Sequence, residues 1–305
     1  MRWGIPVVRG PGRTVALGVL ALALLLRILP FQIIAEPRLL IFDLEQRLWP
    51  STSDPAGVVI VDIDDRSLAQ YGQWPWPRSL VAKLVRRISE GHPQVLGIDI
   101  VFAERDRLSP PEIAQELPDL PPPLASELAR MPASEHDLAE AMRAIPTVIE
   151  LAPGDGNPAA SSEKLRLAQI LQIGGDPRPY LKNFNTLLRS RSELETAAQG
   201  AGVDIVGPDG DGITRRLALA VSYQGEIVPS FALEVLRVGG AEPVVINTQN
   251  FGIEDIQVGK HTIPTDRYGR AILHFAKPIV PYSAADVLDP AFTSQRCRGG
   301  WCCWL

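Results

Sequence analysis

A strand–helix–strand pattern near the start of the chain limits its fold more than any other feature. Residues 57–64, GVVIVDID, and residues 95–102, VLGIDIVF, are short apolar runs of the kind that forms buried strands. Between them, residues 78–91 have apolar positions at helical spacing, with Pro77 and Gly91 as start and stop signals. Two strands joined by a helix through short connections predict a βαβ unit with a parallel pair of strands.

The later segments add strands and helices around this unit. Residues 147–152 predict a third strand, and a helix before it opens at Ser134, with Asp137 completing a capping box. Residues 107–133 hold seven prolines and predict a long, semi-rigid loop or insertion. The other expected elements are a short helix at 162–172, a helix at 192–202, a strand at 203–206, a hairpin leading into a helix at 230–238, strands on both sides of 266–270, and a helix capped by Ser283. The expected fold class is α/β, a mixed sheet with a βαβ core and flanking helices.

An apolar segment precedes this fold. Residues 14–34 are 21 in number, and about 20 are needed to span a bilayer as a helix. Three arginines and no acidic residue stand before the segment, which predicts an N-terminus in the cytoplasm. We therefore expect a basic tail at 1–13, one transmembrane helix at 14–35 and an exported domain at 36–289. A cleaved signal peptide is the alternative, and it exports the same domain.

Composition excludes several classes of function. A net charge of −5 gives no basic stripe for nucleic acid. The chain has no phosphate-binding loop, no G-x-S-x-G, no H-E-x-x-H and no kinase or cyclase signature, so we expect no cofactor and no enzyme. All three cysteines lie in the last nine residues, so the body of the chain has no disulfide framework. A metal or redox site on these cysteines remains an alternative, although a partner cluster is missing.

Acidic residues follow the first predicted strand and lie in the second. Asp62, Asp64 and Asp65 stand at the first, and Asp99 at its neighbour. Ligands of open α/β sheets bind beyond the carboxyl ends of the strands, so these carboxylates are candidate ligand-binding residues. In an enzyme interpretation, the chain would be a metal-dependent hydrolase that uses the carboxylates of Asp62, Asp64 and Asp99. The structural alternative is that they cap turns and helix starts or pair with nearby arginines.

The segment GQWPWPR at 72–78 supplies three further candidates. Trp74 and Trp76 have the rings to stack on a ligand, or alternatively to pack a loop against the sheet while Pro77 starts the helix. Arg78 has the geometry to clamp an anion, or to pair with an acidic residue of the preceding turn.

A second signature, DGDGITRR, lies at 209–216. Asp209, Asp211 and Gly212 resemble part of a calcium loop, but the positions that an EF-hand fills with glycine and glutamate hold other residues. The motif therefore predicts a tight turn. We expect Arg215 and Arg216 after it to form a solvated strand edge.

Together these segments resemble the second class of CHASE domain, an extracellular sensory module associated with cyclases and histidine kinases. The resemblance covers about residues 42–289. The motifs that carry it are FDLEQRL (42–48), VVIVDIDDRSL (58–68), GQWPWPR (72–78), GIDIVF (97–102), DGDGITRR (209–216), IPTDRYGRAILHF (263–275) and YSAADVL (282–288). It implies an α/β sensory domain with an unknown ligand, an N-terminal membrane helix, further membrane helices after the domain and a cytoplasmic cyclase or kinase output.

The tail at 290–305 departs from this pattern, because the final apolar strand of the family is missing. Trp301, Cys302, Cys303 and Trp304 are encoded by TGG-TGY-TGY-TGG. One base back, the same nucleotides read Val-Leu-Leu, preceded by Leu, Val or Met and followed by Ala or Val. Such an apolar run is typical of a buried strand. We therefore expect the tail to be a frameshift product, with the missing output encoded in another frame.

The sequence thus predicts a membrane-anchored extracytoplasmic sensory domain without its output. Its expected partners are the membrane and an unidentified small-molecule or protein signal, and it is compatible with a homodimer. An envelope scaffold that binds no ligand is the main alternative.

Overall fold

The chain divides into two structural units. The computed structural model describes residues 11–28, 31–50, 57–154, 165, 167–205, 207–275, 278–292 and 302–304. One unit comprises Met1–Ser53 with His274–Lys277, and the other comprises Asp54–Leu273 with Pro278–Leu305.

The first unit contains two helices, α1 (Pro11–Ile28) and α2 (Phe31–Leu48). The sequence predicts one apolar helix through 14–34, whereas the described helix α1 ends at Ile28 and a second begins at Phe31. Within the residues that were described, no helix combines the length and the apolar character that crossing a membrane requires. In this unit, the imidazole of His274 contacts the Gln46 amide at 3.0 Å and meets the Phe42 ring edge-on, with 6.0 Å between centroids.

The second unit is built on a mainly parallel sheet. Its strands are β1 (Val58–Asp62), β2 (Leu96–Ile98), β3 (Thr147–Pro153), β6 (Leu187–Leu188), β7 (Gly200–Val203), β15 (Tyr282–Ser283) and β16 (Cys302–Trp304). They lie in the order β15-β1-β16-β2-β3, and β3 then pairs with both β6 and β7. All of these pairs are parallel except β3 with β6, which confirms the mixed α/β sheet.

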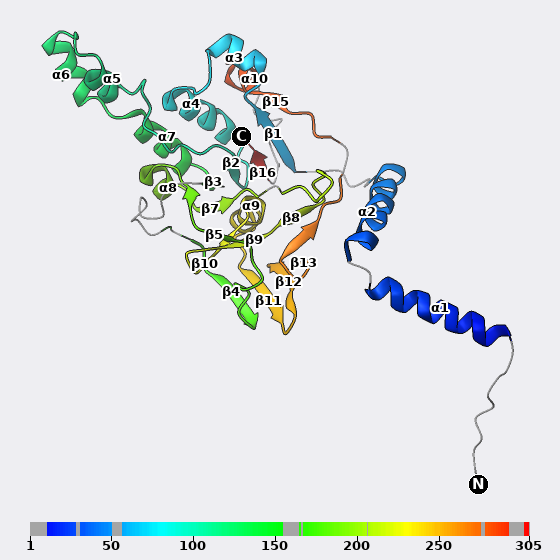
Figure 1. Cartoon of the computed structure of the whole chain (residues 1–305). Coiled ribbons are helices and arrows are strands. Elements are labelled where there is room, and N and C mark those ends of the chain that lie inside the picture. The colour runs from blue at the N-terminus through cyan, green and yellow to red at the C-terminus, as the bar shows by residue number, and fades with distance from the viewer. Residues whose placement is uncertain are drawn as a thin grey trace. The chain divides into compact units, whose positions relative to one another are not determined.

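The predicted βαβ unit is present, but its two strands are not neighbours. Helix α4 (Arg78–Ser89) connects β1 to β2, as the start and stop signals indicate. Strand β16 lies between them, pairing Val59 with Cys303 on one side and Leu96 with Cys303 on the other (Figure 1). Local sequence does not reveal a strand inserted from the far end of the chain, so the prediction of a directly paired β1 and β2 was wrong.

Helices cover both faces of this sheet. Helices α4, α7 (Ser134–Arg143), α8 (Ser192–Ala197) and α10 (Ala284–Leu288) contribute to an apolar cluster with Ile98 and Ile149. Helix α9 (Phe231–Gly240) lies against the opposite face, where Phe231 packs with Val148. Strand β7 approaches α9 so closely that a Cβ on Gly202 would stand 2.6 Å from the Phe231 Cα.

A second layer of sheets extends the unit. The strands of this layer are β4 (Ile170–Gly174), β5 (Asn183–Phe184), β8 (Arg216–Ala218), β9 (Ala220–Tyr223), β10 (Glu226–Pro229), β11 (Val244–Gln249), β12 (Gly252–Val258), β13 (His261–Pro264) and β14 (Arg270–Ile272). They form the sheets β13-β12-β11-β4, β10-β9-β5 and β14-β8. The hairpin β9–β10 turns at Gln224 and Gly225, both at positive φ, as predicted for that connection.

Three local predictions were wrong. The segment 107–133 contains two helices, α5 (Pro110–Glu116) and α6 (Pro122–Arg130), because proline is tolerated in the first turn of a helix. Helix α7 begins at Ser134 itself, without a side-chain cap. The helix predicted at 162–172 gives way to strand β4 from Ile170, and residues 162–164 and 166 lie outside the described residues.

Two further elements differ from prediction in their bounds. The helix predicted at 192–202 ends at Ala197, and β7 begins at Gly200 rather than at residue 203.

The Ser283 cap of α10 is present: its hydroxyl accepts a hydrogen bond from the Ala285 N–H at 3.3 Å. The short helix α3 (Asp65–Tyr71) follows β1.

Candidate functional site

A large cleft lies at the carboxyl ends of β1 and β2. Its volume is about 1050 Å³, slightly above the roughly 300–1,000 Å³ of typical ligand pockets. Asp62 closes β1 and Asp99 directly follows β2, and both line the cleft together with Trp74, Arg78 and Glu150. Four of the seven residues selected from this part of the sequence therefore come together at one site.

Strand geometry brings three carboxylates together beside this edge. Gly97 lies against Phe231 of α9, and side chains alternate along a strand, so Asp99 points to the same face. The Glu150 side chain points to that face because Glu150 follows Val148 by two residues. Asp204 points there because it follows Gly202 by two residues. Carboxylate oxygens of Asp99, Glu150 and Asp204 all lie within 4.8 Å of one another.

Crowding of these acids changes their protonation. Burial, the charge of Asp99, a hydrogen bond with the Asp99 carboxyl group and the charge of Asp204 together raise the pKa of Glu150 to about 7. Burial and Asp99 also raise the pKa of Asp204. Glu150 is therefore partly protonated near neutral pH, and the cluster exchanges a proton in that range.

Arg78 is the basic residue that we selected from the sequence for this site. Its side chain is 7% exposed, and its guanidinium lies 4.5 Å over the Phe102 ring. The two terminal nitrogens donate long hydrogen bonds to the carbonyls of Trp76, at 3.5 Å, and Glu104, at 3.4 Å. Its Nε–H has no hydrogen-bond partner. Burial lowers the pKa of Arg78, opposed by the charges of Asp106, Glu135 and Glu104.

The two tryptophans have different roles. Trp76 is buried, and its indole N–H donates to the Gly72 carbonyl at 2.9 Å, which matches the packing alternative. Trp74 is 42% exposed and lines the cleft. Of the two tryptophans, Trp74 is therefore the one that offers its ring to a ligand in the cleft.

Asp64 and Asp65 belong to a helix start. The Asp64 carboxylate accepts hydrogen bonds from the Ser67 N–H at 2.9 Å and from the hydroxyls of Ser67 and Ser283, at 2.6 and 2.8 Å. These hydrogen bonds lower its pKa. Asp65 lies exposed in the first turn of α3. Arg66 pairs with Asp286 at 2.8 Å rather than with this acidic turn.

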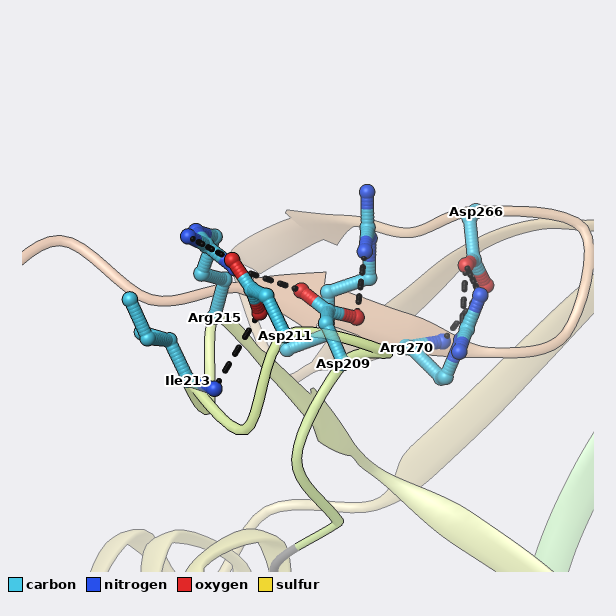
Figure 2. A network of polar contacts seen from close by, with 7 residues as sticks. Asp209, Asp211, Ile213, Arg215, Asp266 and Arg270 are labelled. Atoms are coloured by element: carbon cyan, nitrogen blue, oxygen red, sulfur yellow. Dashed lines mark hydrogen bonds and ion pairs between the residues drawn. The ribbon is translucent and has the colours of Figure 1, made fainter. Parts of the chain in front are cut away.

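The turn signature forms a separate polar network (Figure 2). Arg215 donates to both carboxylate oxygens of Asp211, at 2.9 and 2.7 Å, and contacts Asp209 at 3.5 Å. Arg216 pairs with Asp209 at 2.8 Å. The Arg215 hydrogen bonds lower the pKa of Asp211 to about 2. Gly212 takes a positive φ of 83°, which a tight turn requires.

This network corrects the expectation of a solvated strand edge. Arg215 is only 2% exposed, and the two aspartates of its own loop compensate its charge. Beside it, Arg270 donates to Asp266 at 2.8 Å, and β14 pairs with β8. The arrangement ties two signature segments together, which is a structural role.

Sequence reasoning missed Glu150 and Asp204. Each is an acidic residue inside an otherwise apolar strand pattern, TVIELA at 147–152 and VDIV at 203–206. A charge within a buried-type strand was the available signal, because such a residue is costly unless a partner or ligand compensates it.

The fold and the cleft define an α/β domain with an acidic, ligand-sized cleft at the carboxyl edge of its central sheet. The family model of the CHASE2 domain matches residues 16–299, so this chain belongs to the CHASE2 domain family. CHASE2 is a family of extracellular sensory domains, not of catalysts, and the resemblance inferred from the motifs is confirmed.

The other two comparisons gave no relatives. No curated protein matches the chain. No solved structure matches it either.

Proposed function

We propose that this chain is the signal-input domain of a bacterial-type receptor and that its signal binds in the cleft at the carboxyl ends of β1 and β2. The observation that carries the proposal is the convergence of Asp62, Trp74, Arg78 and Asp99 on one ligand-sized cleft. These residues come from three sequence motifs, and a domain with only a structural role would not need an open cleft where they meet.

We further propose that the domain is exported, with the N-terminus in the cytoplasm. The support is the apolar sequence of residues 14–34 behind three arginines. A reporter enzyme that is active only outside the cytoplasm, fused after residue 289, tests this orientation. Activity after residue 289 and none after residue 10 is expected, and the reverse pattern contradicts it.

A thermal-shift screen of the purified full chain tests the sensory role. A compound that binds the native state alone raises the melting temperature by mass action. We expect at least one small molecule to do so, and expect Trp74→Ala to reduce the shift. A screen without any stabilising compound, together with stoichiometric capture of an envelope protein, would instead support the scaffold alternative.

A further inference from the structure

The four-stranded sheet of the second layer ends in a strand that is paired on one side. Strand β4 pairs in parallel with β11, and among the described residues no strand pairs with its other side (Figure 1). The backbone N–H and C=O groups of alternate residues of such a strand point away from its neighbour. They are a template for pairing with a further strand.

Strand β4 lacks the features that usually protect an edge. Its five residues, ILQIG, include no charged residue and no proline. The opposite edge of the same sheet is different, because Pro264 ends β13 and Lys260 directly precedes it. Proline and lysine at an edge oppose pairing with another chain. The sheet is therefore protected at one edge and open to pairing at the other.

Two large apolar side chains of β4 are exposed. The exposed fraction is 45% for Leu171 and 60% for Ile173. Leu171 lies in register with Val245 of β11, and the neighbours of Val245, Val244 and Ile246, belong to the buried apolar cluster of this layer. Because side chains alternate along a strand, Leu171 and Ile173 share the face that turns away from that cluster. A partner strand that covered both side chains would gain from their burial.

The sequence of β4 is complementary to a second copy of itself. Around a two-fold axis at Gln172, two antiparallel β4 strands place Leu171 of each copy opposite Ile173 of the other. Residues directly opposite each other share a face, so the exposed side chains of both copies form one apolar patch. The two Gln172 amides meet on the other face, where each has a donor and an acceptor for the other. No like charges meet, since the strand has none.

We propose that β4 is the self-association surface of this domain and pairs with β4 of a second copy about a two-fold axis at Gln172. The two four-stranded sheets then form one continuous sheet. A pair of five-residue strands is a small interface, so we expect a weak dimer with a Kd of roughly 10–500 µM. The proposal does not depend on a ligand in the cleft, because no residue of β4 lines that cleft.

Sedimentation velocity of the full chain tests the proposal, in a non-ionic detergent that covers the apolar segment 14–34. The dimer fraction should rise with protein concentration between about 5 µM and about 1 mM. Ile173→Lys should weaken dimerisation by about tenfold or more, because the two-fold axis places the new charge in both halves of the contact. Val280→Lys is the matched control: Val280 is 83% exposed and lies outside the strands, so the dimer should be unchanged.

An exchange of charges tests the register. Leu171→Glu should also weaken dimerisation by itself. Residue 171 of one copy lies opposite residue 173 of the other, so a mixture of the Leu171→Glu and Ile173→Lys chains brings one glutamate opposite one lysine. The mixed dimer should therefore be tighter than either variant with itself, by about threefold or more. Both wild-type side chains are exposed, so both variants should fold with the wild-type melting temperature.

Four outcomes overturn the inference. A chain that stays monomeric at about 1 mM has no such surface. A dimer that Ile173→Lys leaves intact uses another surface, and a dimer that Val280→Lys weakens equally responds to charge in general. A mixed pair no tighter than the single variants excludes the two-fold register at Gln172. All four leave ligand binding in the cleft as a separate question, which the thermal-shift screen decides.

Discussion

Glu150 places a carboxyl group where its charge is unfavourable for stability. It lies in the middle of β3, where its neighbours Ile149 and Leu151 are fully buried. Its carboxyl group lies close to two other acids, which follow the ends of the adjacent strands β2 and β7. Stability therefore gains nothing from this charge, which makes Glu150 a candidate for a role in binding.

The raised pKa of Glu150 predicts a specific pH dependence of stability. A carboxyl whose folded pKa, about 7, exceeds its ordinary value of 4.5 keeps its proton longer in the folded state. Folding then loses stability as pH rises from 4.5 to 7, and the loss remains above pH 7. Glu150→Gln should leave the melting temperature nearly unchanged at pH 4 and raise it by a few degrees at pH 8, since Glu150 is half-buried and water screens part of the effect.

Differential scanning fluorimetry at the two pH values measures this change. Glu127→Gln on α6 is the matched control, because that side chain is exposed. An equal shift at pH 4 and pH 8 for Glu150→Gln would contradict the assignment of the titration to this residue.

At the scale of elements, two glycines decide where α9 packs. A Cβ on Gly97 would stand 3.1 Å from the Phe231 ring, and one on Gly202 would meet the Phe231 backbone at 2.6–2.7 Å. The bare backbone of β7 therefore lets α9 lie directly on the sheet. Asp99 and Asp204 each follow one of these glycines by two residues, so their side chains point to the same face of the sheet.

Gly202→Ala should consequently destabilise the domain. The new methyl group meets backbone atoms, which cannot rotate away, so overpacking of about 1–3 kcal/mol is expected in urea unfolding. Gly210→Ala is the control, since nothing lies within 4 Å of its Cβ position. Equal unfolding free energies for the two variants would show that α9 adapts without cost.

Prolines illustrate a limit of reading elements from composition. Clustered prolines at 110–111 and 121–123 indicate an irregular loop by frequency alone. In the structure each cluster begins a helix. The N–H groups of the first helical positions have no partner within the helix, so proline there loses no helical hydrogen bond. Whether residues after a proline continue as a helix depends on the packing of those residues, which composition does not contain.

At the scale of the whole molecule, the most informative feature of the fold is the position of β16 between β1 and β2. The last described residues, Cys302–Trp304, pair in parallel with β1 on one side and β2 on the other. A central strand of a parallel sheet is usually apolar throughout, since both faces are covered. The alternative reading frame gives Val-Leu-Leu at these three positions.

The frameshift stays a prediction, and the position of β16 makes it testable in the protein. Replacing Cys302, Cys303 and Trp304 with Val, Leu and Leu should raise the melting temperature, because strands of parallel sheets that are covered on both faces are rich in Val, Ile and Leu. Sequencing the locus should show the coding sequence continuing in another frame after codon 305. A stop codon there, with no membrane helix encoded downstream in any frame, would contradict the idea.

Local patterns in the sequence determined several of the elements and the family. The apolar runs, Pro77 and the hairpin turn predict β1, α4 and the β9–β10 hairpin, because these depend on neighbours along the chain. The acidic residues after β1 and β2 indicated the edge of the sheet at which the cleft lies, since parallel strands end together.

Only the tertiary structure decided which residues share the cleft. Asp64 and Asp62 are two residues apart, yet one caps α3 and the other lines the cleft. Glu150 and Asp204 join Asp99 because β3 pairs in parallel with both β2 and β7. Strand order is set by contacts between residues far apart in the chain, so no local pattern records it.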